Sequence, residues 1–320
     1  MKLRVMMLCV VSLAVLALSP WLGGSLKGDL GWQILWQLRV PRVLMAALVG
    51  ATLSLVGACY QTIFANPLAA PSTVGTTAGA TLGALVPLVL GTILGPQMIQ
   101  SAFGLPVTAL AAFAGALAVS LLVAAVAVQG RARVNDVLLA GIAVSLAAGA
   151  ISAGLQYTAD QAALFAAIQW SLGHLPQVGY RGVLMLLPFV LPVWVVLLLQ
   201  TRALNALLGG EQRAHSQGVD VPRIRALVLG VGALGVAACV AWCGPIAFVG
   251  LLVPHLVRLG LGVNRRVLLP MSLVVGAGFL AACDLGARLA LPGRELPVGV
   301  ITAGLGAPAL VWLILRGNRS

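Results

Sequence analysis

The sequence predicts an all-α polytopic membrane protein with about ten transmembrane helices. Of its 320 residues, 61% are hydrophobic and only 8% are charged, whereas a soluble domain usually carries about 25% charged residues. Apolar runs recur along the whole chain, and about 20 apolar residues suffice for one helical crossing of the bilayer. Because these runs are continuous rather than alternating with polar residues, the predicted spans are helices and not barrel strands.

The first apolar run follows Lys2 and Arg4, as in a signal peptide. No clear small-residue cleavage site follows it and no hydrophilic mature protein appears, so we expect a retained first span. An even number of spans places both termini on one side, and we expect one transmembrane domain, 1–320. The expected spans are 5–24, 42–64, 73–95, 104–128, 137–157, 182–200, 226–243, 246–261, 268–290 and 297–315.

The net charge of +12 does not indicate nucleic-acid binding, because the basic residues are scattered singly between apolar runs. With a cytoplasmic N-terminus, thirteen basic residues fall inside and six outside, in agreement with the positive-inside rule. Four of the six exceptions form two short clusters and therefore need a functional reason. They are Arg39, Arg42, Arg288 and Arg294.

A weak internal repeat joins the stretch "VPRVLMAALVG" at Val40 to "VPRIRALVLGV" at Val221. An odd number of spans separates the copies, so they cross the membrane in opposite directions. This arrangement is typical of the inverted repeats of transporters. Coincidence between two helices rich in Val, Ala, Leu and Gly is the alternative.

The apolar pattern breaks once for a long stretch, at 201–225, on the predicted cytoplasmic side. A solvated loop is one interpretation. A loop of this length in a compact domain is more often functional, and its leucines give it an apolar helical stripe. We therefore predict a docking surface for a partner. Those leucines are Leu204, Leu207 and Leu208.

A small, weakly polar stripe follows one face of the fifth span, at i, i+4, i+7 and i+11. It predicts the wall of a translocation pathway, and a packing seam against a neighbouring helix is the alternative. The stripe consists of Ser145, Gly149, Ser152 and Gln156.

Residues suited to catalysis or metal binding are sparse. The three histidines and five cysteines have no partners at the spacing that a metal site needs, so we expect no metal site. His174, in an outer segment, is a weak candidate for contact with a solute. Lys2 and Lys27 stand outside any G-K-[S/T] context, so the chain holds no standard P-loop for ATP.

Several strings in register resemble the FecCD/BtuC-like permeases of bacterial ABC importers over about residues 30–316. Among them are "RVPRVLMAALVGATLSLVGACYQTIFANPLAAPSTVGTTAGA", "WSLGHL", "LNALLGGEQRAHSQGV" and "GRELPVGVITAGLGAPALVWLIL". The resemblance implies a type II ABC importer fold and a homodimer in the bacterial inner membrane. It also implies two ATPase subunits that use ATP and Mg²⁺, and a periplasmic binding protein. The chain itself would carry no cofactor and perform no covalent chemistry.

The resemblance also assigns residue roles. Arg39, Arg42 and Arg288, with Arg294 nearby, would receive acidic residues of the binding protein, because the arginine fork grips a carboxylate at two points. The stripe on the fifth span would line the pathway. Residues of 201–225 would seat in the ATPase; these are Asn205, Glu211, Arg213, Ala214 and Gly218.

Three positions depart from the family pattern: Ala70 replaces a common acid, Gln217 a usual leucine and His174 a usual small residue. The resemblance implies an iron complex as substrate, haem or a ferric siderophore, and His174 favours haem because imidazole ligates its iron. Cobalamin is the alternative. An ion-coupled secondary transporter would need acids near mid-membrane, which the spans lack.

Overall fold

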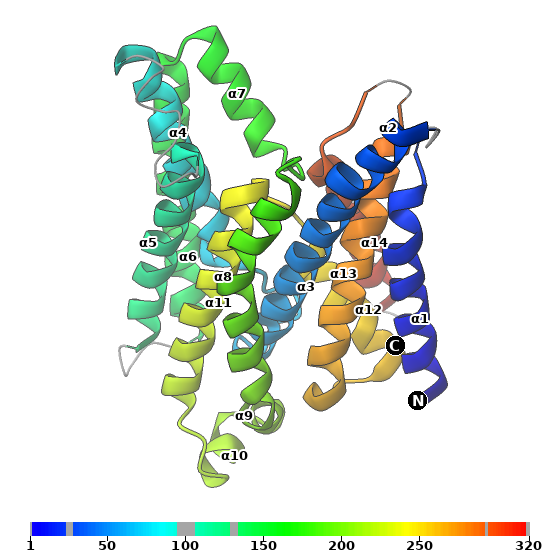
Figure 1. Ribbon diagram of the computed structural model, residues 1–320. Coiled ribbons are helices and arrows are strands. Elements are labelled where there is room, and N and C mark those ends of the chain that lie inside the picture. The colour runs from blue at the N-terminus through cyan, green and yellow to red at the C-terminus, as the bar shows by residue number, and fades with distance from the viewer. Residues whose placement is uncertain (1, 24–27, 95–105, 129–133, 292–293, 318–320) are drawn as a thin grey trace.

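The computed structural model describes residues 2–23, 28–94, 106–128, 134–291 and 294–317 (Figure 1). These residues form a helical bundle, with a single isolated bridge between Leu291 and Arg294 as their only extended pairing. The ten long helices are α1 (Lys2–Leu18), α3 (Val40–Ile63), α4 (Thr76–Leu94), α5 (Val107–Val128), α6 (Val134–Thr158), α8 (Gly179–Leu199), α11 (Val221–Cys243), α12 (Val249–Leu261), α13 (Arg265–Leu289) and α14 (Val298–Gly317).

These ten helices coincide in order with the ten predicted spans. Among the described residues, seven helices are long and apolar enough to cross a membrane, and three shorter apolar stretches occupy the remaining places. The shorter stretches are Thr76–Gly91, Val249–Leu261 and Val298–Trp312. The predicted all-α, ten-helix architecture is therefore confirmed.

Short helices lie at the two ends of the bundle (Figure 1). At one end are α2 (Gly28–Gln33) and α7 (Gln161–Ser171), and at the opposite end are α9 (Thr201–Ala206) and α10 (Glu211–Ser216). The chain begins α1 at the α9–α10 end, and α14 runs toward that end. The sequence did not predict α2 or α7, because both are too short to show a clear apolar period.

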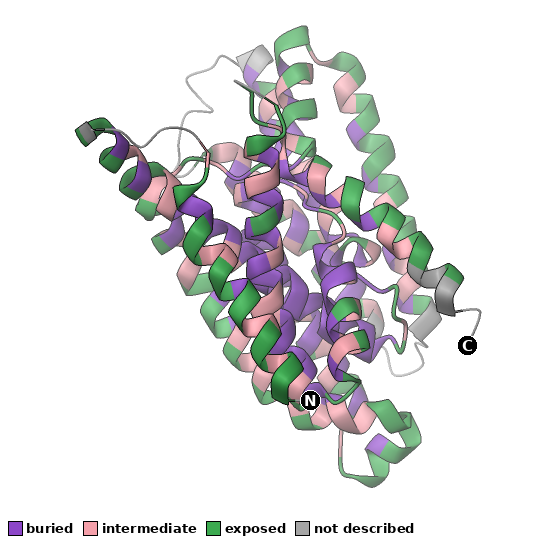
Figure 2. Cartoon of the chain, turned by 90° about the vertical axis from the view of Figure 1, so that its right-hand side faces the viewer, coloured by how far each residue is buried: buried purple, intermediate pink, exposed green. Residues whose placement is uncertain are grey.

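Helix α3 lies at the centre of the bundle and is buried almost throughout. Figure 2 shows that the buried residues gather in the middle of the bundle. Helix α3 packs against α8, α11, α12 and α13. Glycines allow this, because a Cβ at Gly57 would collide with the backbone of Gly250 and a Cβ at Gly50 with that of Gly276. Small residues at helix contacts let backbones approach closely in membrane proteins.

Helices α4 and α5 form a second tight pair. A Cβ at Gly79 would meet the carbonyl oxygen of Gly115, and one at Gly83 would meet that of Ala111. The spaced small residues of this span therefore act in helix packing. Gly75, at φ +87°, ends the turn before α4, a conformation that glycine adopts without strain.

The two copies of the internal repeat begin at opposite ends of the bundle. Helix α3 starts beside α2, and α11 starts beside α10 (Figure 1). Each copy places proline in its first helical turn, where the missing N–H has no intrahelical partner to lose. The inverted direction predicted from sequence is therefore confirmed.

Candidate functional site

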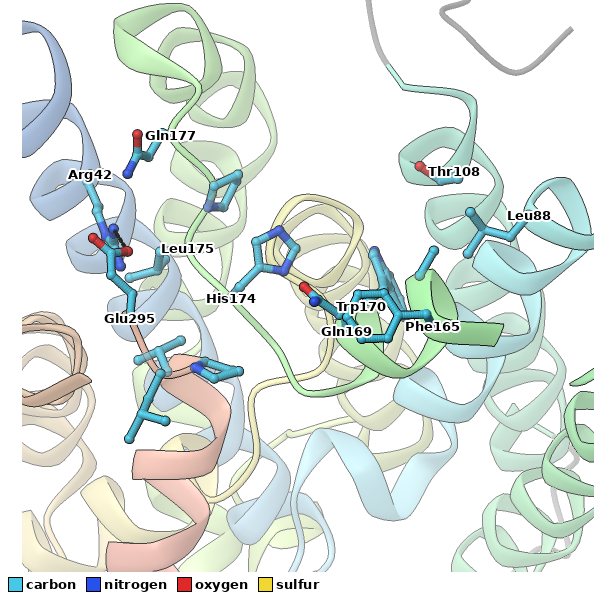
Figure 3. A pocket seen from close by; sticks show the side chains of 15 residues that line it. Arg42, Leu88, Thr108, Phe165, Gln169, Trp170, His174, Leu175, Gln177 and Glu295 are labelled. Carbon is cyan, nitrogen blue, oxygen red and sulfur yellow. Dashed lines mark hydrogen bonds and ion pairs between the residues drawn. The ribbon is translucent and has the colours of Figure 1, made fainter. Parts of the chain in front are cut away.

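A cavity of about 740 Å³ opens at the α2–α7 end of the bundle. We refer to it as the vestibule. Its walls come from α7, the segment 172–178, the start of α3 and the residues that lead into α14. The lining residues are Arg42, Leu88, Thr108, Phe165, Ala166, Gln169, Trp170, His174, Leu175, Pro176, Gln177, Glu295, Leu296, Pro297 and Val298. Figure 3 shows His174 pointing into this space between Glu295 on one wall and Trp170 on the other.

Helix α7 forms the aromatic wall of the vestibule. Its first turn is capped by Asp160, whose carboxylate accepts a hydrogen bond from the Ala163 N–H at 2.7 Å. Such a cap satisfies one of the free amides that begin every helix. Phe165 and Trp170 then face the cavity, together with Gln169. These three residues were not predicted from the sequence, although two aromatic residues in a short outer segment were an available signal.

Two charged residues of the opposite wall, Arg42 and Glu295, belong to a cluster of four charged side chains that extends behind the cavity. Asp284 on α13 is fully buried and contacts Arg42 at 2.9 Å and Arg288 at 3.1 Å. Arg42 also contacts Glu295 at 2.6 Å, and Glu295 is half exposed at the mouth of the cavity. The side chains of Arg42 and Arg288 are only 7% and 8% exposed. The cluster therefore joins α3, α13 and the start of α14 through buried ion pairs.

Arg39 and Arg288 bind a second element, the chain after α1. Arg288 donates to the carbonyl and hydroxyl oxygens of Ser19 at 3.1 and 2.9 Å. Arg39 donates to the carbonyl oxygens of Pro20 and Gly23. Both arginines line a cavity of about 450 Å³, together with Arg42, Gln177 and Glu295.

The structure thus brings Arg39, Arg42 and Arg288 together around one cavity. Each of the three makes its contacts within the chain. Arg294 differs, because it is exposed and lies beside the vestibule wall. Of the four arginines predicted to receive a partner's acids, Arg294 is the one exposed residue, whereas Arg39 and Arg288 are partly buried and Arg42 is buried. The docking role itself stays a prediction.

The predicted pathway stripe of α6 divides between two environments. Ser145 is half-buried and lies near Gly75 beside α4, and Ser152 is buried. Gly149 instead faces open space, with no atom within 4 Å of an added Cβ. Gln156 is half-buried. The stripe therefore lies along the border between the α4 contact and the open face of α6, and the pathway assignment stays a prediction.

The segment predicted as a docking surface consists of α9, a 3-10 turn at Leu207–Gly209, and α10. Two side chains of this segment tie it to long helices. The side-chain Oδ1 of Asn205 accepts a hydrogen bond from the backbone N–H of Arg265, the first residue of α13, at 3.1 Å. Glu211 contacts Arg225 of α11 at 2.7 Å. A displacement of the segment would therefore act on both α11 and α13.

Other residues of this segment occupy distinct positions. Ala214 is fully buried, and Gly218 at φ +78° ends the turn after α10. A cavity of about 530 Å³ on this side is lined by three arginines, and no acidic residue is among its described lining residues. The lining is Arg202, Asn205, Ala206, Leu208, Gly209, Arg213, Gln217 and Arg266. Gln217, one of the departures, thus lies in a cationic pocket.

Ala70, another departure, is buried at the start of the turn before α4. Thr73 donates to its carbonyl oxygen at 2.7 Å. A carboxylate there would enter a small, mostly apolar cavity lined by Phe248 and Leu251. The small apolar side chain of alanine therefore suits this buried position.

Comparison with known proteins places these features in a family. The model of the FecCD transport family matches residues 4–316. The vitamin B12 import system permease protein BtuC of Vibrio cholerae is 38% identical over 315 residues, which cover 98% of this chain and 91% of that protein. The hemin transport system permease protein HmuU of Yersinia pestis is 36% identical over 288 residues, covering 90% of this chain and 85% of that protein.

A solved structure agrees with the sequence comparisons. It is described as an inward-facing conformation of a metal-chelate type ABC transporter, and it superposes on this chain with a TM-score of 0.87 at 28% identity. The superposition covers 99% of this chain and 100% of the other. The similarity therefore extends over nearly the whole chain.

Proposed function

The chain belongs to the FecCD transport family, and from this we propose that it is the membrane-spanning permease subunit of an ATP-driven importer. The substrate that we propose is an iron complex, haem or a ferric siderophore, and cobalamin is the alternative. The permease would move this substrate by alternating access and make or break no covalent bond. The structural observation that carries the proposal is the pairing of a substrate-sized vestibule at one end with a segment of short helices at the other.

The partners follow from this role. Two ATPase subunits, which use ATP and Mg²⁺, would dock on α9–α10, and two copies of this chain would share the translocation pathway. A periplasmic binding protein would dock at the vestibule end. With the chain in a bacterial inner membrane, the α9–α10 end and both termini would be cytoplasmic. No nucleic acid has a place in this mechanism.

The contacts of α9–α10 indicate how ATP could act on the vestibule. Asn205 holds the first residue of α13, and Asp284 near the other end of α13 holds Arg42 and, through it, Glu295. Helix α13 has 25 residues, so it is about 37 Å long at 1.5 Å per residue. A movement of α9 would therefore reach the vestibule wall along one helix.

Docking of the binding protein is tested most cleanly at Arg294. The triple variant with Arg39, Arg42 and Arg288 changed to Glu is expected to abolish docking, but it also breaks the buried ion pairs of Asp284. Arg294→Glu leaves those pairs intact and should weaken docking by charge reversal at an exposed position. Equal affinity of the binding protein for Arg294→Glu and the parent chain would remove Arg294 from the docking surface.

An ion-coupled secondary transporter is the function from another class. Such a protein needs acids near the middle of its spans, whereas the seven acids of this chain lie at helix ends, in loops or in the buried cluster. They are Asp29, Asp136, Asp160, Glu211, Asp220, Asp284 and Glu295. This distribution supports the ATP-driven mechanism.

The deciding experiment is uptake into proteoliposomes that contain the permease, its ATPase and its binding protein. Ferric haem, a ferric siderophore and cyanocobalamin are offered in parallel, with and without internal Mg-ATP. The proposal predicts uptake of an iron complex that requires ATP and the binding protein. Uptake driven by an ion gradient in the absence of the ATPase would overturn it.

A further inference from the structure

The imidazole of His174 is the only histidine ring among the described residues that line the vestibule. The side chain is exposed to the cavity and points into its centre (Figure 3). Among the described residues, no group forms a hydrogen bond with the imidazole, and no cluster of three metal-ligating side chains exists. A lone histidine therefore faces a substrate-sized space with its ring nitrogens free to bind a ligand.

The backbone around His174 is held firmly. Its N–H donates to the carbonyl oxygen of Cys243 at the end of α11, at 2.8 Å. The preceding residue, Gly173, adopts φ +68° and accepts the Gly299 N–H of α14 at 3.2 Å. A Cβ on Gly173 would collide with the carbonyl oxygen of Pro245. Three separate elements thus fix the position from which the imidazole projects.

The walls around His174 differ in character. Phe165 and Trp170 give an aromatic surface on the α7 side, and Arg42 with Glu295 gives a charged surface opposite. A flat, largely apolar ring stacks well against aromatic side chains. Polar groups on the edge of such a ring would meet the charged wall. The cavity is therefore suited to a planar molecule with polar substituents.

The protonation state of His174 suits a metal ligand. The surrounding cavity walls partly desolvate the imidazole and so lower its pKa below the ordinary value, and the nearby Arg42 guanidinium lowers it further. Arg42 and Glu295 are the charged side chains that face it from the other walls of the vestibule. At neutral pH the imidazole is therefore uncharged, and a neutral imidazole is the form that binds a metal.

A single histidine distinguishes between classes of metal complex. In ferric haem the ring supplies four ligands and an axial position stays open, so one imidazole can complete the coordination. A hexadentate siderophore saturates its iron, and cyanocobalamin saturates its cobalt. Of these three complexes, only ferric haem has an open axial position to which His174 can bind directly.

We propose that His174 is an axial ligand for a substrate metal macrocycle of the haem type as it occupies the vestibule. The proposal rests on the proposed importer function and narrows its substrate. It assigns ring stacking to Phe165 and Trp170 and metal ligation to His174. No bond of the macrocycle changes, because the imidazole only occupies a coordination position and leaves it when the substrate moves on.

The test is a titration of the full-length permease in lipid nanodiscs with ferric haem, followed by the Soret band. The parent chain should give the band of a histidine-ligated ferric haem. His174→Ala should lose this band and bind at least about tenfold more weakly, and free imidazole should restore it. The matched control is His215→Ala in α10, at the opposite end of the bundle, which should match the parent.

Two further probes distinguish metal ligation by His174 from recognition of the shape of the macrocycle. Metal-free protoporphyrin and cyanocobalamin offer no open metal position, so their affinities should be equal for the parent and His174→Ala. An unchanged Soret band in His174→Ala, or no recovery with imidazole, would overturn the proposal. ATP-dependent uptake in proteoliposomes is measured on the same variants, so the importer function stands if uptake persists while the ligation result fails.

Discussion

The buried carboxylate of Asp284 offers the sharpest test of how the vestibule is held together. Asp284 is 0% exposed and lies between two guanidiniums, with contacts of 2.9 Å to Arg42 and 3.1 Å to Arg288. Asp284→Asn keeps the shape of the side chain and removes its charge. Two buried arginines would then face each other, and only Arg42 would retain an acid, Glu295.

The magnitude follows from these distances. At an effective dielectric constant of about 20, each contact contributes roughly 5 to 6 kcal/mol of Coulomb attraction. The cost of removing the charges from water offsets much of this attraction. When only Asp284 is neutralised, the two arginines remain charged and buried, so their desolvation cost remains. Removing one member of a buried pair typically costs about 3–5 kcal/mol. We expect Asp284→Asn to lower the free energy of unfolding by that amount.

The measurement is reversible unfolding in mixed micelles, with Asp220→Asn as the matched control. Asp220 pairs with Arg223 at 2.9 Å, but these side chains are 47% and 87% exposed. The amide of the control variant can still cap α11, so its stability should fall by no more than about 1 kcal/mol. Equal stability of the two variants would refute the assignment of the cluster as a structural lock.

Three other outcomes follow from the structure. Gly57→Ala should lower the free energy of unfolding by about 1–3 kcal/mol, because the added Cβ meets the Gly250 backbone. Gly230→Ala adds its Cβ to open space and should raise that free energy by about 0.5–1 kcal/mol. Equal unfolding free energies of the two variants in chemical denaturation would contradict the Gly57–Gly250 contact. Asn205→Ala should raise the ATP hydrolysed per substrate transported, since it frees the start of α13, and an unchanged ratio would argue against that tie. Haem binding should stay constant above pH 7 and be lost only as the pH falls below the ordinary imidazole pKa of about 6.5. The reason is that desolvation lowers the pKa of His174, and protonation of the imidazole removes the ligand. Loss of haem binding already near pH 8 would contradict ligation by His174.

The helical architecture was predictable because apolar length is a local property. Each long helix coincides with a run of hydrophobic residues in the sequence, and the spans predicted at 73–95 and 246–261 match α4 and α12 to within a few residues. The short helix α7 was missed because eleven residues at the membrane boundary carry no such run. Its aromatic residues were visible in the sequence, but no periodicity indicated that they would line a cavity.

The site was only partly predictable. Arg42 and Arg288 stood out as basic residues on the outer side, and their sequence positions are consistent with a docking surface. Their distance from each other in sequence hides that both contact Asp284, and that Arg42 reaches Glu295. Such pairs depend on the packing of α3 against α13, so no single stretch of sequence contains them.

The sequence by itself determined that this protein spans the membrane many times, in which direction its two repeats run, and where its few charges lie. Hydrophobicity and charge act residue by residue, so they can be read without knowing the fold. Only the tertiary structure decided which charges neutralise each other and which remain exposed, as Arg42 and Arg294 illustrate. It also decided that His174 faces a cavity rather than a neighbouring helix. The physical reason is that burial and ion pairing depend on contacts between helices that are remote in sequence.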